Sequence, residues 1–212
     1  MRRQPGNRDK LDHARTAIAN EAARIIQEQG LTDYRAAKDK ARERLGLRPN
    51  RPLPSNEEIE IALAERNRIF RGAGHWECLR ALRNSAATVM HSLADYFPRL
   101  TGSVLSGNAT EHSAIDLHLF SDPAETVAAS LDSLGIRHRS AQFGYSFERG
   151  KTERYPGYRF AVNDSEFRAT VFPLLKRRHA PLSPVDGKPM QRAAVKEIER
   201  LIATPADPNA AC

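Results

Sequence analysis

The fold is decided by the stretch Leu100-Thr-Gly-Ser-Val-Leu-Ser-Gly-Asn-Ala-Thr-Glu-His-Ser-Ala-Ile-Asp-Leu-His-Leu-Phe120. Its apolar residues predict a short strand over residues 100–104 and a second strand over 114–120, joined by a polar turn around Gly107. Asp116 is the one carboxylate of the second strand. Because alternate residues of a strand point to the same side, Ala114 and Asp116 are expected to share one face.

Upstream of this stretch the sequence has a helical period. Apolar residues recur every three to four positions in four segments, residues 11–29, 33–45, 55–70 and 75–93. Asp33 and Ser55 are suited to N-cap two of these helices, and Glu58 has the capping-box spacing from Ser55. On the fourth helix, the apolar stripe that begins at Trp76 is expected to face the core.

Downstream, the pattern alternates between helix and strand. A helix is expected over 123–134 and a strand over 136–147, followed by a charged turn region over 148–157. Next comes a hairpin, whose strands are 158–162 and 166–172 and whose turn is Asn163-Asp164-Ser165. The last expected elements are an irregular loop over 173–189 and a helix over 193–202. This order predicts the α+β class, with an N-terminal helical region followed by a small mixed sheet and flanking helices. We expect a helical region over 1–96, an α/β domain over 97–204 and a flexible tail over 205–212.

The composition is that of a globular protein. Of the 212 residues, 40% are hydrophobic and 28% are charged. The net charge of +7 indicates either an anionic partner, such as a nucleotide or RNA, or simply an arginine-rich solvated surface. The two cysteines are too few for a disulfide framework, and the N-terminus lacks the apolar run of a signal peptide. We therefore expect a cytoplasmic protein with no membrane partner.

Gly102-Ser103 and Asp116 together resemble the signature of the polymerase-beta-like nucleotidyltransferase superfamily. That signature is a Gly-Ser pair followed by two carboxylates separated by one apolar residue, and Ala114 stands in place of the first carboxylate. The N-terminal part is similar to the helical lead-in of an uncharacterised bacterial nucleotidyltransferase-like family, in residues 14–24, 33–38 and 53–59.

This resemblance implies transfer of a nucleoside monophosphate from a nucleoside triphosphate to an acceptor hydroxyl. In such reactions two magnesium ions bind carboxylate oxygens, and a Gly-Ser turn lets the backbone approach the phosphates. The resemblance implies Asp116 as the catalytic metal ligand, and it places Arg168 where a third carboxylate is usual, with Glu166 as a substitute ligand. The phosphate-binding residues that it implies are Gly102, Ser103, Arg168 and Lys176.

Because two of three expected carboxylates are replaced, three interpretations stay open. The first is a nucleotidyltransferase-fold protein with a degraded metal site, which is an enzyme only if magnesium still binds. The second is a non-catalytic nucleotide- or RNA-binding module that uses Arg168 and the basic run from Lys176 to Arg178. The third is a protein whose N-terminal helices bind a partner. His118 is interpreted as structural or exposed rather than as a base.

Overall fold

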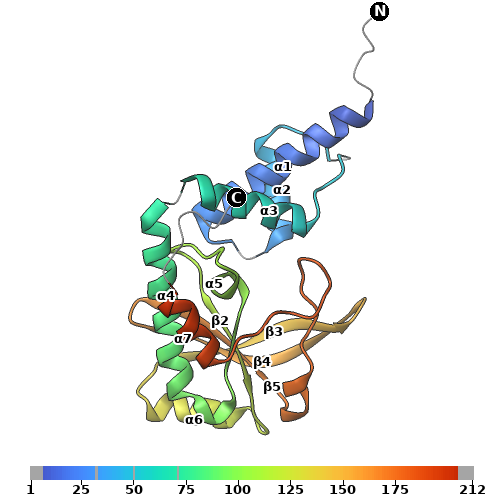
Figure 1. Ribbon diagram of the computed structural model, residues 1–212. Helices are drawn as coiled ribbons and strands as arrows, with labels where there is room; N and C mark the ends of the chain where they lie inside the picture. Colours follow the sequence, from blue (N-terminus) through green and yellow to red (C-terminus); the bar gives the residue numbers. More distant parts are fainter. Residues whose placement is uncertain (1–6, 32, 50, 71, 205–212) are drawn as a thin grey trace, which may run out of the picture. The chain divides into compact units, whose positions relative to one another are not determined.

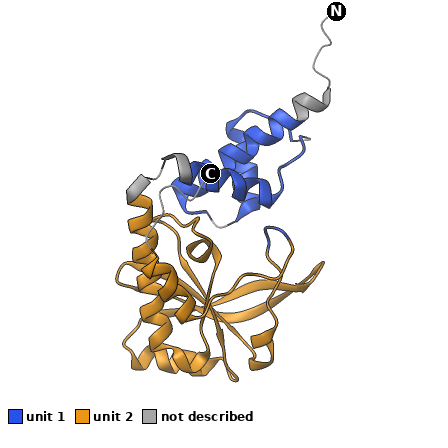
Figure 2. Cartoon of the chain, viewed as in Figure 1, with its two compact units in different colours: residues 1–72, 184–186 blue, residues 73–183, 187–212 orange. Residues whose placement is uncertain are grey.

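The computed structural model describes residues 7–31, 33–49, 51–70 and 72–204, and it confirms the α+β class (Figure 1). The chain divides into two compact units, residues 1–72 with 184–186, and residues 73–183 with 187–212 (Figure 2). The boundary therefore falls well before the expected position at residue 96. The flexible tail expected over 205–212 lies outside the described residues.

The first unit contains three helices, α1 (Asn7–Gln29), α2 (Tyr34–Arg44) and α3 (Asn56–Phe70). The carboxylate of Asp33 accepts hydrogen bonds from the first backbone amides of α2, which confirms the expected cap. Ser55 and Glu58 exchange the two hydrogen bonds of a capping box at α3. The core of this unit is built from aliphatic side chains of all three helices, chiefly Ile18, Ala22, Ile25, Ala37, Ala41, Ile59 and Leu63.

The second unit begins at Ala73, one residue into α4 (Gly72–Ser92), and this helix is followed by a short 3-10 turn, η1 (Ala94–Tyr96). Leu79, Ala86 and Met90 of α4 are buried against the sheet, which explains why this helix belongs to the second unit. Trp76 was expected in the core but is 44% exposed, because it lies in the first turns of α4, ahead of the part that packs on the sheet.

The second unit is organised around one five-stranded mixed sheet with the order β1-β2-β5-β4-β3. Its strands are β1 (Arg99–Thr101), β2 (Ile115–Phe120), β3 (His138–Glu148), β4 (Lys151–Val162) and β5 (Ser165–Phe172). β2 runs antiparallel to β1 and parallel to β5, and β4 is antiparallel to both of its neighbours. The register between β2 and β5, the central strands of this region, determines which side chains meet in the candidate site.

Two of the expected local structures were wrong. The strand expected over 100–104 ends at Thr101, because Gly102 adopts a φ of +72° and begins a short helix, α5 (Gly102–Ser106). The charged turn region expected over 148–157 is mostly strand, since β4 begins at Lys151. Charged side chains are tolerated there because the ends of β3 and β4 extend as a two-stranded ribbon with many exposed residues.

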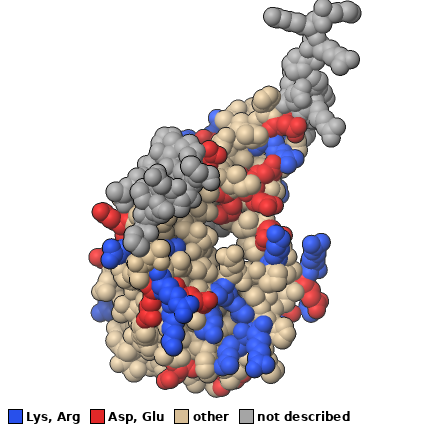
Figure 3. All heavy atoms as spheres, in the orientation of Figure 1, with Lys and Arg blue, Asp and Glu red and all other residues tan. Residues whose placement is uncertain are grey.

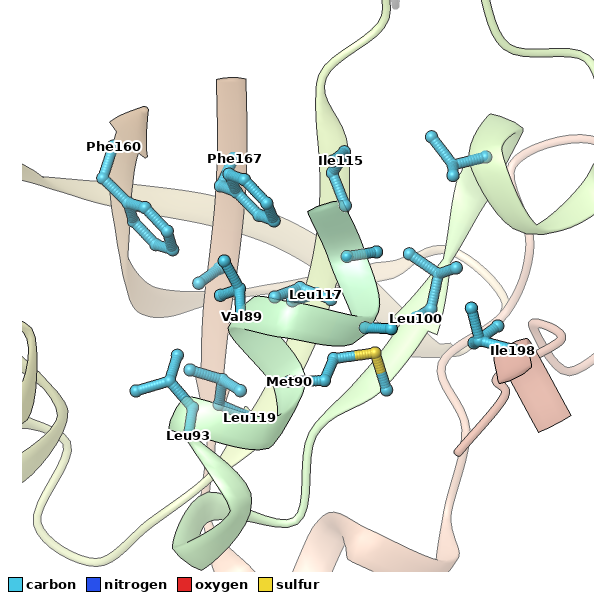
Figure 4. Packing of buried hydrophobic residues seen from close by; sticks show 14 of the residues in the cluster. Val89, Met90, Leu93, Leu100, Ile115, Leu117, Leu119, Phe160, Phe167 and Ile198 are labelled. Atoms are coloured by element: carbon cyan, nitrogen blue, oxygen red, sulfur yellow. The ribbon is translucent and has the colours of Figure 1, made fainter. Parts of the chain in front are cut away.

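One face of the sheet carries the main core (Figure 4). Leu117, Leu119 and Phe167 point from β2 and β5 toward Val89 of α4 and toward Leu93, which follows that helix. Two further helices pack on this cluster, α6 (Glu125–Ser133) and α7 (Val195–Ala203). Alternation along the strands then places Asp116, His118 and their register partners on the opposite face.

Within the described ranges, none of the helices has both the length and the apolar character that crossing a membrane requires.

The opposite face is partly covered by aromatic rings and by the chain that follows β5. Phe120, Phe172 and Tyr155 form a second buried cluster, against which Tyr145 and Phe147 pack. A 3-10 turn, η2 (Leu174–Arg178), follows β5 directly. This face therefore has an aromatic end near η2 and a polar end near Asp116.

Candidate functional site

The candidate site is a row of side chains that crosses the whole sheet at one level. Thr101 of β1 pairs with Asp116 of β2, and Asp116 pairs in turn with Arg168 of β5. Arg168 is opposite Arg159 of β4, and Arg159 is opposite Arg139 of β3. Directly paired residues of neighbouring strands point to the same face of a sheet. Three arginines and one aspartate are thus aligned on one face, and we call this set the arginine row.

Asp116 and Arg168 form the central ion pair of the row. The Nε and Nη2 atoms of Arg168 each donate a hydrogen bond of 2.7 Å, to Oδ1 and Oδ2 of Asp116 respectively. The two side chains are 20% and 21% exposed, so the pair is mostly screened from water. Burial raises the pKa of Asp116 above its ordinary value, and the charges of Arg168 and Arg159 oppose that rise. Two parallel charge-assisted bonds fix the guanidinium in one orientation.

Gly102 makes room for this ion pair. A Cβ atom at Gly102 would lie 2.7 Å from Oδ2 of Asp116, and the backbone has a φ of +72°. Both the missing side chain and the left-handed conformation therefore require glycine here. The next residue, Ser103, lies in the first turn of α5, and the backbone amide of Gly107 closes that turn on its carbonyl oxygen. The sequence motif is thus placed directly against Asp116, as expected.

The outer part of the arginine row is accessible to solvent. Arg159 and Arg139 are both exposed, and neither forms an ion pair with any other residue of the described part of the chain. Arg159 lies over the ring of Phe143, with its Cζ atom 5.7 Å from the ring centroid. Strands of one sheet are about 4.8 Å apart, so these guanidiniums are spaced closely enough to bind one polyanion together.

A second row lies on the same face of the sheet, two residues further along β2 and β5, and its side chains are polar and buried. His118 is fully buried, and its Nε2 atom is 3.3 Å from the hydroxyl of Tyr145. That hydroxyl is also 3.2 Å from Oγ1 of Thr170, the register partner of His118. Burial lowers the pKa of His118 to about 3, with a smaller effect from Arg192. His118 is therefore a neutral structural residue, which agrees with one of the two expected roles.

The structure divides the expected phosphate-binding residues between two ends of the sheet. Gly102, Ser103 and Arg168 lie together at Asp116, whereas Lys176 lies in η2, beyond the far end of β5. Phe172 lies four positions after Arg168 along β5, which corresponds to about 13 Å. Lys176 instead contacts the ring of Phe147, with Nζ 3.9 Å from its centroid. Lys176 therefore belongs to a different surface.

The residues at Asp116 do not fit a magnesium centre. A two-metal site needs several carboxylate oxygens that are free to bind metal. Both oxygens of Asp116 accept hydrogen bonds from Arg168, whose own positive charge would repel a divalent ion. Glu166 is exposed and lies two residues from Arg168 on the same strand, about 7 Å away along β5. The expected pair of ligands, Asp116 and Glu166, is thus not brought together.

Three members of these rows were not predicted from the sequence, namely Arg159, Tyr145 and Thr170. The alternation of β4 places Arg159 on the face of Tyr155, but its partnership with Arg168 depends on the hairpin register. The tight turn at Asn163-Asp164, both with positive φ, was the signal that fixed that register. Tyr145 reaches Thr170 across β4, and no local pattern indicates such a contact.

No protein-family model matches this sequence, and no curated protein matches it significantly.

Proposed function

We propose that this chain is a non-catalytic nucleotide-binding protein of the cytoplasm, built on a nucleotidyltransferase-like arrangement whose metal site is replaced by an arginine. The observation that carries the proposal is the bidentate pair between Arg168 and Asp116. In this pair the guanidinium stands where the resemblance implies bound metal ions. It supplies a permanent positive charge without needing a metal, because arginine does not lose its proton near neutral pH.

The position of the Gly-Ser motif supports the nucleotidyltransferase-like part of the proposal. Gly102 follows β1 directly and lies against the carboxylate of Asp116, so a backbone with no side chain faces the site. The hydroxyl of Ser103 makes no hydrogen bond with other described residues, and it can therefore donate to a ligand oxygen. The glycine thus accommodates the ion pair, and the serine beside it supplies a donor for a phosphate oxygen.

The phosphates are proposed to bind along the arginine row. Arg159 and Arg139 are exposed and can each offer two parallel donors to phosphate oxygens. Arg168 is already paired with Asp116, so its role is to position this carboxylate and to neutralise a negative charge that would otherwise repel a phosphate. Because both oxygens of Asp116 accept hydrogen bonds from Arg168, binding is expected to be independent of magnesium.

The test is calorimetric titration of the full chain with ATP, in buffer containing EDTA and in buffer containing magnesium. We expect binding in EDTA, and no gain in affinity with magnesium, since the metal neutralises part of the phosphate charge. Arg159→Ala should weaken binding by roughly 10- to 100-fold, the value of one charge-assisted hydrogen bond of about 1.5–3 kcal/mol.

Arg154→Ala is the matched control. Arg154 is an exposed arginine of the same strand, but alternation places it on the other face of β4. The affinity of the Arg154→Ala variant for ATP should stay within about twofold of the parent's affinity. This difference is well below the tenfold change that corresponds to about 1.4 kcal/mol. Binding that requires magnesium would point to a working metal site instead, and equal losses in the two variants would show that only overall charge matters.

A further inference from the structure

A second basic surface lies at the aromatic end of the sheet, away from Asp116. Its cations come from β1, from η2 and from the chain before α7. We call these residues the η2 cation cluster, namely Arg99, Lys176, Arg177, Arg178 and Arg192. In the space-filling view, Lys and Arg side chains gather on the second unit, around and to the right of the position of α7 in Figure 1 (Figure 3). Among ion pairs between described residues, none involves a member of this cluster.

Three members of the η2 cation cluster lie over aromatic rings. The Cζ atom of Arg177 is 4.2 Å from the centroid of Phe97. Lys176 lies over Phe147 at 3.9 Å, and Arg192 lies over Phe120 at 5.6 Å. Such contacts are worth about 0.5–2 kcal/mol each. These three cations are therefore held against rings rather than extended freely into solvent.

Backbone contacts bring the cluster members close to one another. Nη2 of Arg192 donates to the carbonyl oxygen of Arg177 at 3.2 Å. Nη1 of Arg99 donates to the carbonyl oxygen of Pro98 at 3.0 Å, beside Phe97. Burial lowers the pKa of Arg192, and the nearby charge of Arg99 lowers it further. Like charges have thus been brought together, which costs energy unless an anion binds them.

The acidic residues near the cluster do not neutralise it. Asp122 accepts a hydrogen bond from the backbone amide of Leu174 at 3.0 Å, and so caps η2. Glu153 accepts a hydrogen bond from the hydroxyl of Tyr155, and Lys176 contributes less than this bond to lowering its pKa. Asp95 is exposed in η1, two residues before Phe97. Arg177 and Arg178 are left as exposed cations.

Exposed apolar groups lie among these cations. Phe97 is 40% exposed and Leu175 is 87% exposed, with Leu174 beside it. A surface that offers fixed cations, an exposed ring and a protruding leucine suits a partner with both phosphates and flat apolar faces. Single-stranded nucleic acid has these two properties, because its bases are not fully stacked on one another.

We propose that the η2 cation cluster binds single-stranded RNA or DNA, with one base stacked on the Arg177–Phe97 pair and the phosphates bound by Arg178 and Arg99. Guanidinium groups and aromatic rings are the stacking surfaces that single-strand-binding proteins use. This proposal does not depend on nucleotide binding at the arginine row, since the two surfaces share no residue. An anionic membrane would need a broader apolar surface than one leucine pair, so we favour the nucleic acid.

The test is fluorescence anisotropy with a labelled ten-nucleotide oligouridylate and the full chain, at increasing salt. Binding should weaken with salt by a log-log slope of about 0.7 for each phosphate contacted. Arg177→Lys keeps the charge but loses the planar group, and base stacking is worth about 1–3 kcal/mol. We therefore expect at least a fivefold loss of affinity for this variant.

Two controls separate stacking from charge. Arg137→Lys is the matched substitution, since Arg137 is exposed and precedes the opposite end of β3 from Phe147. The Arg137→Lys variant should bind the oligonucleotide with the same affinity as the parent. An abasic oligonucleotide of equal length should bind the parent and the Arg177→Lys variant equally, since it carries phosphates without bases.

The proposal is overturned if the oligonucleotide does not bind at low salt, or if the Arg177→Lys and Arg137→Lys variants bind it equally. It is also overturned if vesicles containing phosphatidylserine bind the chain while the oligonucleotide does not. That last result would assign the η2 cation cluster to a membrane surface.

Discussion

At the level of single residues, the arginine at position 168 decides what Asp116 can bind. A carboxylate on this face could in principle hold a metal ion, a guanidinium or a proton. The bidentate geometry, with both bonds at 2.7 Å, commits it to the guanidinium. Ala114 adds no competing carboxylate on the same strand, so the pair has no rival partner there.

Removing Asp116 should destabilise the protein, because it leaves the partly buried cation of Arg168 without a partner. For a pair that is about one-fifth exposed, we expect Asp116→Ala to cost about 1–3 kcal/mol in the free energy of unfolding. The double variant Asp116→Ala/Arg168→Ala should cost less than the sum of the two single changes. Urea unfolding of all four proteins measures this coupling, and strictly additive costs would contradict a direct interaction.

His118 should make stability depend on pH between 7 and 5. Its folded pKa is about 3 because of burial, whereas the unfolded chain has the ordinary value near 6.5. As the pH falls below 6.5, only the unfolded state takes up the proton, so stability decreases. From pH 7 to pH 5 the loss should be about 2 kcal/mol from this group.

The variant His118→Phe isolates that contribution. Phenylalanine keeps a ring beside Phe172 and Tyr145 but cannot take up a proton. Unfolding of both proteins at several pH values should show a flatter dependence for the variant between pH 7 and 5. Identical slopes would mean that folding does not lower the pKa of His118.

At the level of elements, the pairing of β4 with β5 depends on one glycine. A Cβ atom at Gly157 would overlap the carbonyl oxygen of Ala169, and it would lie 2.8 Å from a ring carbon of Phe143. A backbone oxygen cannot move aside without separating the two strands. The ring of Phe143 therefore packs over a position where only glycine fits.

Gly157→Ala should consequently be strongly destabilising, by about 2–4 kcal/mol, a size that overpacking reaches when the backbone must shift. Gly144→Ala on the edge strand β3 is the control, since its Cβ would meet only the methyl group of Thr152, at 3.2 Å. That change should cost less than about 1 kcal/mol. Thermal unfolding compares the two, and a similar loss in both would contradict this account of β4.

At the level of the whole molecule, the described parts of the two units have separate cores. The aliphatic cluster of α1, α2 and α3 shares no residue with the cluster that surrounds the sheet. The second unit holds the arginine row and the η2 cation cluster, so both proposed ligands are assigned to it. Each unit can therefore unfold as a cooperative body of its own.

Unfolding should accordingly occur in two steps. The single tryptophan, Trp76, belongs to the second unit and reports on it by fluorescence. Circular dichroism at 222 nm also detects helices α1, α2 and α3 of the first unit. The two probes should give different urea midpoints. ATP should raise only the fluorescence midpoint, because a ligand stabilises the unit that binds it. Coincident midpoints would mean that the units unfold together.

The local structure of this chain was largely determined by the sequence itself. Asp33, Ser55 and Glu58 cap the helices as their spacing predicted, and the hairpin turns at Asn163-Asp164. These features depend on residues within a few positions of each other, where backbone geometry alone selects the conformation. The mixed α+β organisation follows from the order of such elements.

The partners within the candidate site were decided only by the tertiary structure. Asp116 and Arg168 are 52 residues apart, and their contact depends on the parallel register of β2 and β5. A shift of that register by one residue would turn Arg168 to the other face of the sheet. Lys176 was separated from Arg168 in the same way, because the length of β5 carries it to the far end of the sheet. Long-range register is set by the packing of the whole core, which no local pattern contains.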